Sequence, residues 1–137
     1  MRIDEITNEG TEPSYYTSYV IDKASRRTLL KAFPPKYNLV GHHVTVEFGM
    51  SADSALPDPA KIKVIGYADD GSLEALLVEI NGTTKRSDGK TYHLTWSKTK
   101  DRRSVESNQV IGMAQHIEPI EIDGVPTLSE IKPTAES

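Results

Sequence analysis

Gly-His-His-Val-Thr-Val-Glu-Phe-Gly occupies residues 41–49, and Thr-Tyr-His-Leu-Thr-Trp-Ser occupies residues 91–97. In both stretches polar and apolar residues alternate, which is typical of a β-strand with one buried face. In the first stretch Val44, Val46 and Phe48 share the apolar side. We therefore expect two strands that pack their apolar faces on a core.

The polar face of each predicted strand carries a histidine and a threonine. His43 precedes Thr45 by two positions, and His93 precedes Thr95 in the same way. Residues two apart in a strand point to the same side, so each strand presents an imidazole beside a hydroxyl. Two such pairs that face each other would form a phosphate-sized site with two proton-transfer groups.

Caps, turn residues and alternation predict the other elements. We expect an α+β fold with two short helices. The predicted elements are a strand at residues 15–21, a helix that Asp22 or Ser25 caps and Pro34 ends, a hairpin of strands at residues 62–67 and 73–80, a helix from Ser104 to near Gly112, and a strand at residues 117–122 followed by a turn at Asp123-Gly124.

The length of 137 residues suits one domain with a real core. We expect a flexible N-terminal segment at residues 1–13, a single compact domain at residues 14–132 and a flexible tail at residues 133–137. The chain has no cysteine, which fits a reducing compartment. Residues 1–10 are too charged for a signal peptide, so the sequence predicts a cytoplasmic protein with no membrane partner.

The formal net charge is −4, which argues against long duplex nucleic acid as a partner because such binding needs many basic contacts. Basic residues are nevertheless concentrated at residues 85–103, where seven stand against Asp88 and Asp101. This segment contains the second histidine motif. It is either a solvated loop or an anion-attracting rim of the site, and the sequence does not separate the two.

Phosphodiester chemistry without a metal needs one group that accepts a proton and one that donates a proton. Imidazoles do both, because their ordinary pKa of about 6.5 allows one to be neutral and the other charged. His43 and His93 are the candidates for these roles, in an order that the sequence leaves open. The hydroxyls of Thr45 and Thr95 are suited to donate to the nonbridging phosphate oxygens.

The tetrapeptides at residues 43–46 and 93–96 resemble the two motifs of the 2H phosphoesterase superfamily. That family carries His-x-Thr/Ser-x with an apolar fourth residue, and its members include 2′-5′ RNA ligase-like proteins, cyclic phosphodiesterases and viral anti-CBASS nucleases. The resemblance implies two small antiparallel sheets that face each other across a central cleft, and a cofactor-free enzyme. The motifs are only fifty positions apart, which implies short lobes.

The resemblance also implies a nucleotide or short oligonucleotide as substrate, cleaved at a 2′,3′-cyclic phosphate, a 2′-5′ linkage or a cyclic oligonucleotide signal. For substrate binding we expect Lys98 and Lys100 to neutralise phosphate, and Tyr15, Tyr16 or Tyr92 to stack on a base. Whether such an enzyme would serve RNA repair, signal degradation or viral counter-defence stays open.

Three alternatives remain beside this hypothesis. One is a non-catalytic nucleotide- or RNA-binding module of the same fold, and another is a β-rich interaction domain without catalysis. A metal site built from the histidines is discounted, because His42 and His43 would face opposite ways in a strand. Glu47 and Ser97 share faces with the motif residues and are candidates for orienting an imidazole.

Overall fold

The computed structural model describes residues 14–131. The segments expected to be flexible, residues 1–13 and 133–137, lie outside the described residues. In chain order the elements are β1 (Tyr15–Ile21), α1 (Lys23–Ala32), β2 (Asn38–Leu39), β3 (His43–Met50), β4 (Ile62–Asp69), β5 (Leu73–Ile80), β6 (His93–Lys98), the 3₁₀ turn η2 (Ser104–Glu106), α2 (Ser107–Val110), the 3₁₀ turn η3 (Ile111–Met113), β7 (Gln115–Ile122) and β8 (Gly124–Glu130).

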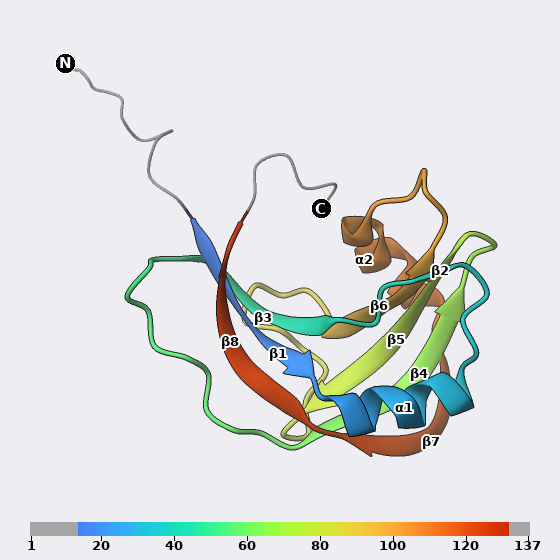
Figure 1. The fold of residues 1–137 in the computed structure, drawn as a ribbon, viewed down its shortest axis with the longest axis horizontal. Coiled ribbons are helices and arrows are strands. Elements are labelled where there is room, and N and C mark those ends of the chain that lie inside the picture. The colour runs from blue at the N-terminus through green and yellow to red at the C-terminus, as the bar shows by residue number, and fades with distance from the viewer. Residues whose placement is uncertain (1–13, 132–137) are drawn as a thin grey trace.

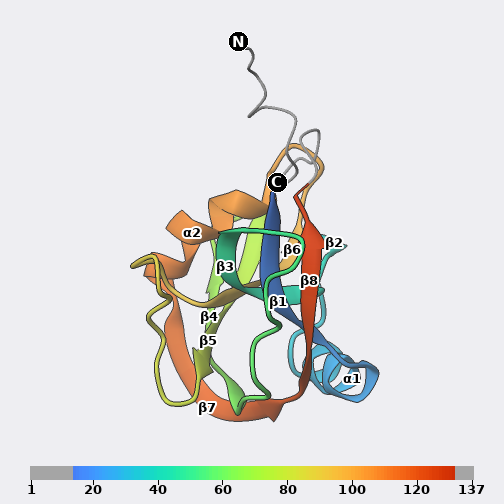
Figure 2. The ribbon, with the colours of Figure 1, turned by 90° about the vertical axis from the view of Figure 1, so that its left-hand side faces the viewer.

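The strands of the described region form one antiparallel sheet in the order β7-β4-β5-β6-β3-β1-β8, with the short β2 paired to β6. β7 and β8 lie at opposite ends of this order, yet only Asp123 separates them in the sequence. The sheet is therefore strongly curled, as Figure 1 and Figure 2 show. The turn expected at Asp123-Gly124 is not a hairpin, because β7 pairs with β4 and β8 pairs with β1.

The two predicted motif strands are neighbours in the middle of the sheet. β3 and β6 are joined by one residue pair, Val44 with Leu94. On one side of this pair lie β3, β1 and β8, and on the other lie β6, β5, β4 and β7. The α+β class, with antiparallel strands and two short helices, is confirmed. The two facing sheets that we expected are here the two halves of one sheet.

Both motif strands contain a β-bulge directly after the motif threonine. Ser18 of β1 pairs with Thr45 and Thr17 pairs with Glu47, so Val46 has no partner on that strand. In the other half, the pairing of β5 with β6 skips Trp96 in the same way. An extra unpaired residue reverses the alternation of side chains beyond it. The two motifs therefore share a backbone irregularity as well as a sequence.

The apolar faces of the motif strands form the centre of the core. Val44, Leu94 and Trp96 are completely buried and belong to one cluster with Leu29 of α1. The indole nitrogen of Trp96 donates to the carbonyl oxygen of Phe33 at 2.8 Å, just beyond the end of α1. Packing on this side leaves the opposite face of β3 and β6 for the polar residues of the motifs.

Both predicted helices are confirmed, and each has a clear local cause. Asp22 caps α1 by accepting from the backbone N–H of Ser25 at 2.8 Å. The second helical segment is broken into η2, α2 and η3, and Val110 and Ile111 pack it against β4 and β5. It stands beside β6 (Figure 1), and Ser107 of α2 contacts Thr95 of β6. Among residues 14–131 no helix has the length and apolarity needed to cross a bilayer.

Candidate active site

The register at Val44 and Leu94 brings the four motif residues together. The motif residues are the positions directly before and after this bridge on each strand, His43 and Thr45 on β3 and His93 and Thr95 on β6. Neighbouring positions of a strand point to opposite faces, so all four side chains lie on the face opposite to Val44 and Leu94. They form one four-residue patch.

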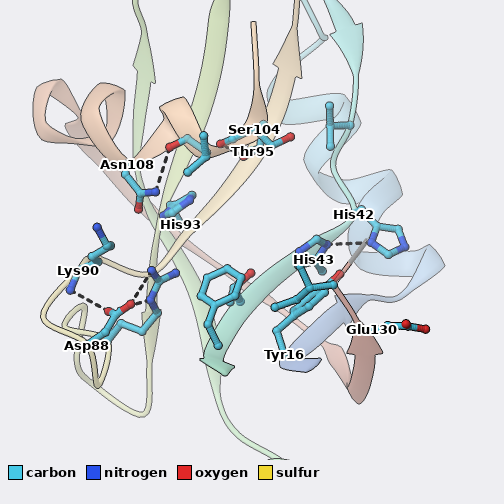
Figure 3. Close-up of a pocket in the computed structure, with 16 residues that line it drawn as sticks. Tyr16, His42, His43, Asp88, Lys90, His93, Thr95, Ser104, Asn108 and Glu130 are labelled. Carbon is cyan, nitrogen blue, oxygen red and sulfur yellow. Dashed lines mark hydrogen bonds and ion pairs between the residues drawn. The ribbon is translucent and has the colours of Figure 1, made fainter. Parts of the chain in front are cut away.

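This patch lines a cavity of about 430 Å³. Figure 3 shows His43 and His93 on opposite sides of it, with His43 beside Tyr16 and His93 near Asn108. The other residues around the cavity come from β1, the β2–β3 connection, β3, the β5–β6 connection, the η2–α2 segment and the end of β8: Tyr16, Val40, His42, Phe48, Arg86, Asp88, Lys90, Ser104, Val105, Asn108, Glu130 and Ile131.

The His93 ring is fixed by a backbone carbonyl. Its Nδ1 lies 2.8 Å from the carbonyl oxygen of Thr91, which can only accept, so Nδ1 carries a proton. Burial lowers the pKa of His93, and the Thr91 hydrogen bond opposes that change while Arg86 adds to it. A neutral His93 therefore keeps its Nε2 free of a proton and able to accept one.

Burial also lowers the pKa of His43, and the neighbouring His42 and His93 lower it further, to about 4. His43 is therefore neutral at pH 7 in the free protein. Its Nδ1 lies 2.9 Å from Nδ1 of His42 (Figure 3). The expectation that His42 and His43 face opposite ways is wrong, because β3 begins only at His43 and His42 belongs to the preceding turn.

The two threonine hydroxyls have different surroundings. Thr95 lies 2.7 Å from the Ser107 hydroxyl and 3.4 Å from the carbonyl oxygen of Ser104, which ties it to the η2–α2 segment. If Thr95 accepts from Ser107, its own proton goes to the Ser104 carbonyl oxygen, so a phosphate oxygen would have to replace that long 3.4 Å bond. Thr45 makes no side-chain hydrogen bond within the described part of the chain, so its hydroxyl is available to a ligand.

Of the residues expected to bind substrate, only Tyr16 lines this cavity, and Tyr15, Tyr92, Lys98 and Lys100 do not. Tyr15 alternates with Tyr16, and it is Tyr16 whose ring packs 5.4 Å from His43. Tyr92 packs against the core on the other side of β6. Lys98 lies at the far end of β6, paired with Leu73, and Lys100 is exposed in the following loop.

The aromatic and cationic side chains at the cavity are instead Tyr16, Phe48 and Arg86. Phe48 was expected on the core face, but the bulge at Val46 turns it to the cavity side, where its ring lies 5.8 Å from Tyr16. Arg86 is 4% exposed and sits 5.4 Å above the Phe48 ring. Its place in the basic segment was the only sequence signal for it.

The same bulges correct the expectation for Glu47 and Ser97. Glu47 is exposed and does not line the cavity. Ser97 is fully buried and donates to the carboxylate of Glu74. Neither residue therefore orients a motif imidazole.

The charges around the cavity are balanced. Arg86 donates from Nε and Nη2 to the two carboxylate oxygens of Asp88, at 3.0 and 2.9 Å. Lys90 and Glu130 add one charge of each sign. The basic segment thus contributes two cations to the rim of the cavity, Arg86, whose charge Asp88 neutralises, and Lys90. Within residues 14–131 no group of three or more histidine, aspartate or glutamate side chains is arranged to hold a metal ion.

Comparison with protein-family models, with curated proteins and with solved structures found no match to this chain. Its function is therefore argued from the chemistry of the cavity.

Proposed function

We propose that this chain is a metal-independent phosphodiesterase of the 2H phosphoesterase type, with His43 and His93 as its proton-transfer groups and Thr45 and Thr95 as phosphate donors. The observation that carries the proposal is the shared cavity. Two His-x-Thr strands, distant in sequence, pair so that all four side chains line one space. The matching bulges after both motifs support an origin of the two halves as one repeated unit.

His93 is suited to be the base. Its Nδ1 proton is held by the Thr91 carbonyl, so Nε2 has a free lone pair at neutral pH. In this role His93 takes the proton from the attacking water or hydroxyl as the new phosphorus–oxygen bond forms. His43 is then the acid that protonates the leaving oxygen.

The acid role requires a proton on Nε2 of His43 when the substrate is bound. In the free protein its pKa of about 4 opposes this. A phosphodiester carries one negative charge, and an opposite charge within a few ångströms favours the charged imidazole. Substrate binding in this mechanism is therefore coupled to the uptake of a proton by His43 or by the His42 imidazole hydrogen-bonded to it.

A nucleotide or short oligonucleotide fits the rest of the cavity. Its volume of about 430 Å³ is at the small end of the range of ligand pockets, roughly 300–1,000 Å³. Tyr16 and Phe48 offer aromatic faces on which a base can stack. The balanced charges favour a single phosphodiester over a long polyanion, as in a 2′,3′-cyclic phosphate, a 2′-5′ linkage or a cyclic oligonucleotide signal. The cysteine-free composition supports a cytoplasmic location.

The second candidate is a non-catalytic nucleotide- or RNA-binding module with the same cavity. The lowered pKa values of both histidines favour it, since neither imidazole carries an acidic proton at pH 7 in the free protein. Such a module would bind the phosphodiester without cleaving it.

The experiment is a hydrolysis panel of 2′,3′-cyclic nucleotides, 2′-5′ dinucleotides and cyclic di- and trinucleotides, with EDTA present and products separated by chromatography. We expect turnover of at least one class, unaffected by the chelator. Calorimetric binding of a panel member with no product would select the binding module. Turnover that EDTA abolishes would contradict a metal-independent mechanism.

A further inference from the structure

The imidazole of His42 lines the cavity and contacts His43, the proposed acid. The two rings are nearly perpendicular, with an interplanar angle of 82° and centroids 5.1 Å apart. Their Nδ1 atoms are 2.9 Å apart, within hydrogen-bond distance (Figure 3). His42 is exposed, whereas most of His43 is covered.

The local backbone holds His42 in this position. Gly41 has a positive φ of 46°, and a Cβ there would lie 2.7 Å from Cζ3 of Trp96, so only glycine fits. The Gly41 N–H donates to the carbonyl oxygen of Thr95 at 3.0 Å, and the carbonyl oxygen of His42 accepts from Ile21 at 3.0 Å. The turn is therefore fastened to both halves of the sheet.

Two Nδ1 atoms at this distance must share one proton. Two bare lone pairs would repel each other, and two N–H groups would clash. When His42 is the donor, a neutral His43 accepts at Nδ1 and carries its own proton at Nε2. When His43 is the donor, its Nε2 is bare.

We propose that His42 is a positioning residue that shares its Nδ1 proton with His43 and so allows that partly buried imidazole to act as an acid at neutral pH. This inference rests on the proposed function. In the step, the Nε2–H bond of His43 breaks as the leaving oxygen gains its proton. The Nδ1 proton of His42 moves to Nδ1 of His43 at the same time, so a charged His42 becomes neutral and His43 stays neutral.

The geometry explains why the exposed ring would hold the charge. An imidazolium at His42 is solvated, whereas burial opposes a charge on His43. The titratable and charged groups that face the pair from neighbouring elements and across the cavity are Tyr16, Glu130, His93, Arg86, Asp88 and Lys90.

The first arm of the test is nitrogen NMR of histidine-labelled full-length protein, compared between wild type and His42→Gln across pH. Glutamine can hydrogen-bond to His43 but cannot hold the charge. We expect the pKa of His43 to rise in the variant, because His42 lowers it in the wild type. An unchanged His43 titration and tautomer would overturn proton sharing, whatever the activity.

The second arm compares leaving groups. A 2′,3′-cyclic nucleotide releases a ribose hydroxyl, which needs a proton, whereas bis(p-nitrophenyl) phosphate releases a stable phenolate. We expect His42→Gln to slow the first reaction about 10- to 100-fold, less than the loss of a general acid itself, and to leave the second nearly unchanged. His116→Gln, at an exposed position on β7, is the matched control.

The outcomes separate the two proposals. Equal losses on both substrates, or no loss on either, would overturn the acid role of the pair while leaving the phosphodiesterase intact. No turnover of either substrate by wild type would overturn the proposed function together with the acid role. The NMR result would then decide proton sharing by itself.

Discussion

Two partly buried, neutral imidazoles define the site at the scale of single residues. Each has its Nδ1 occupied, His93 by a backbone carbonyl and His43 by another imidazole. Both therefore present Nε2 as the reactive atom. The partner of each Nδ1 decides whether Nε2 can carry a proton in the neutral ring. The Thr91 carbonyl leaves Nε2 of His93 bare, which suits the proposed base, whereas His42 allows a proton on Nε2 of His43, which suits the proposed acid.

The lowered pKa of His43 predicts a pH-dependent stability. The folded protein binds this proton only near pH 4, whereas the unfolded chain binds it near pH 6.5. Stability from this group is therefore fully present above pH 6.5 and is lost as the pH falls toward 4, by up to about 3 kcal/mol. Urea unfolding of wild type and His43→Gln at both ends of this range measures the effect. Equal pH dependence in the two proteins would show that His43 is not held neutral.

Stacking on Phe48 gives a second residue-level prediction. Phe48→Ala should raise the KM for a nucleotide substrate about tenfold with little change in kcat, since base stacking on one aromatic ring contributes roughly 1–3 kcal/mol. The control is Leu56→Ala, because Leu56 is similarly exposed but lies in the loop between β3 and β4. If both variants behave alike in steady-state kinetics, Phe48 is not part of the binding surface.

The elements position these residues through one bridge, two bulges and one turn. The bridge between Val44 and Leu94 sets the four motif residues on one patch. The bulges at Val46 and Trp96 then change the faces of the residues that follow. The turn at Gly41 brings a third imidazole against the patch.

Gly41→Ala should destabilise the fold by about 1–3 kcal/mol and reduce activity together with it. The new Cβ would meet the buried Trp96 ring, and alanine is strained at a φ of +46°. Gly112→Ala is the control, because nothing lies within 4 Å of a Cβ there and its φ is not positive. Thermal unfolding of both variants tests this, and a Gly41→Ala protein as stable as wild type would contradict the account of the turn.

Alternation was sufficient to predict the motif strands, their buried Val44 and Leu94, and the polar patch itself. It was not sufficient for Phe48 and Ser97, because a bulge depends on the partner strand and leaves no signature in the sequence. The sequence also did not decide which tyrosine lies close enough to the patch to stack on a base. Tyr15 and Tyr16 look alike in sequence, and only the register of β1 against β3 selects Tyr16.

The whole molecule is a curled sheet in which two similar halves meet at their motif strands. Each half contributes one histidine, one threonine and one bulge to a single cavity. Neither half has a complete set of proton-transfer groups alone. The central claim is therefore that the two histidines work as one unit on one phosphodiester.

The most direct test of that claim is the rate of hydrolysis, in EDTA, of the best panel substrate by wild type, His43→Ala, His93→Ala, the double variant and the control His116→Ala. We predict that each single loss costs about 10²–10⁴ in kcat, that the double variant is little slower than the slower single variant, and that the control is unaffected. A double variant that turns over near the wild-type rate would contradict the two-histidine mechanism.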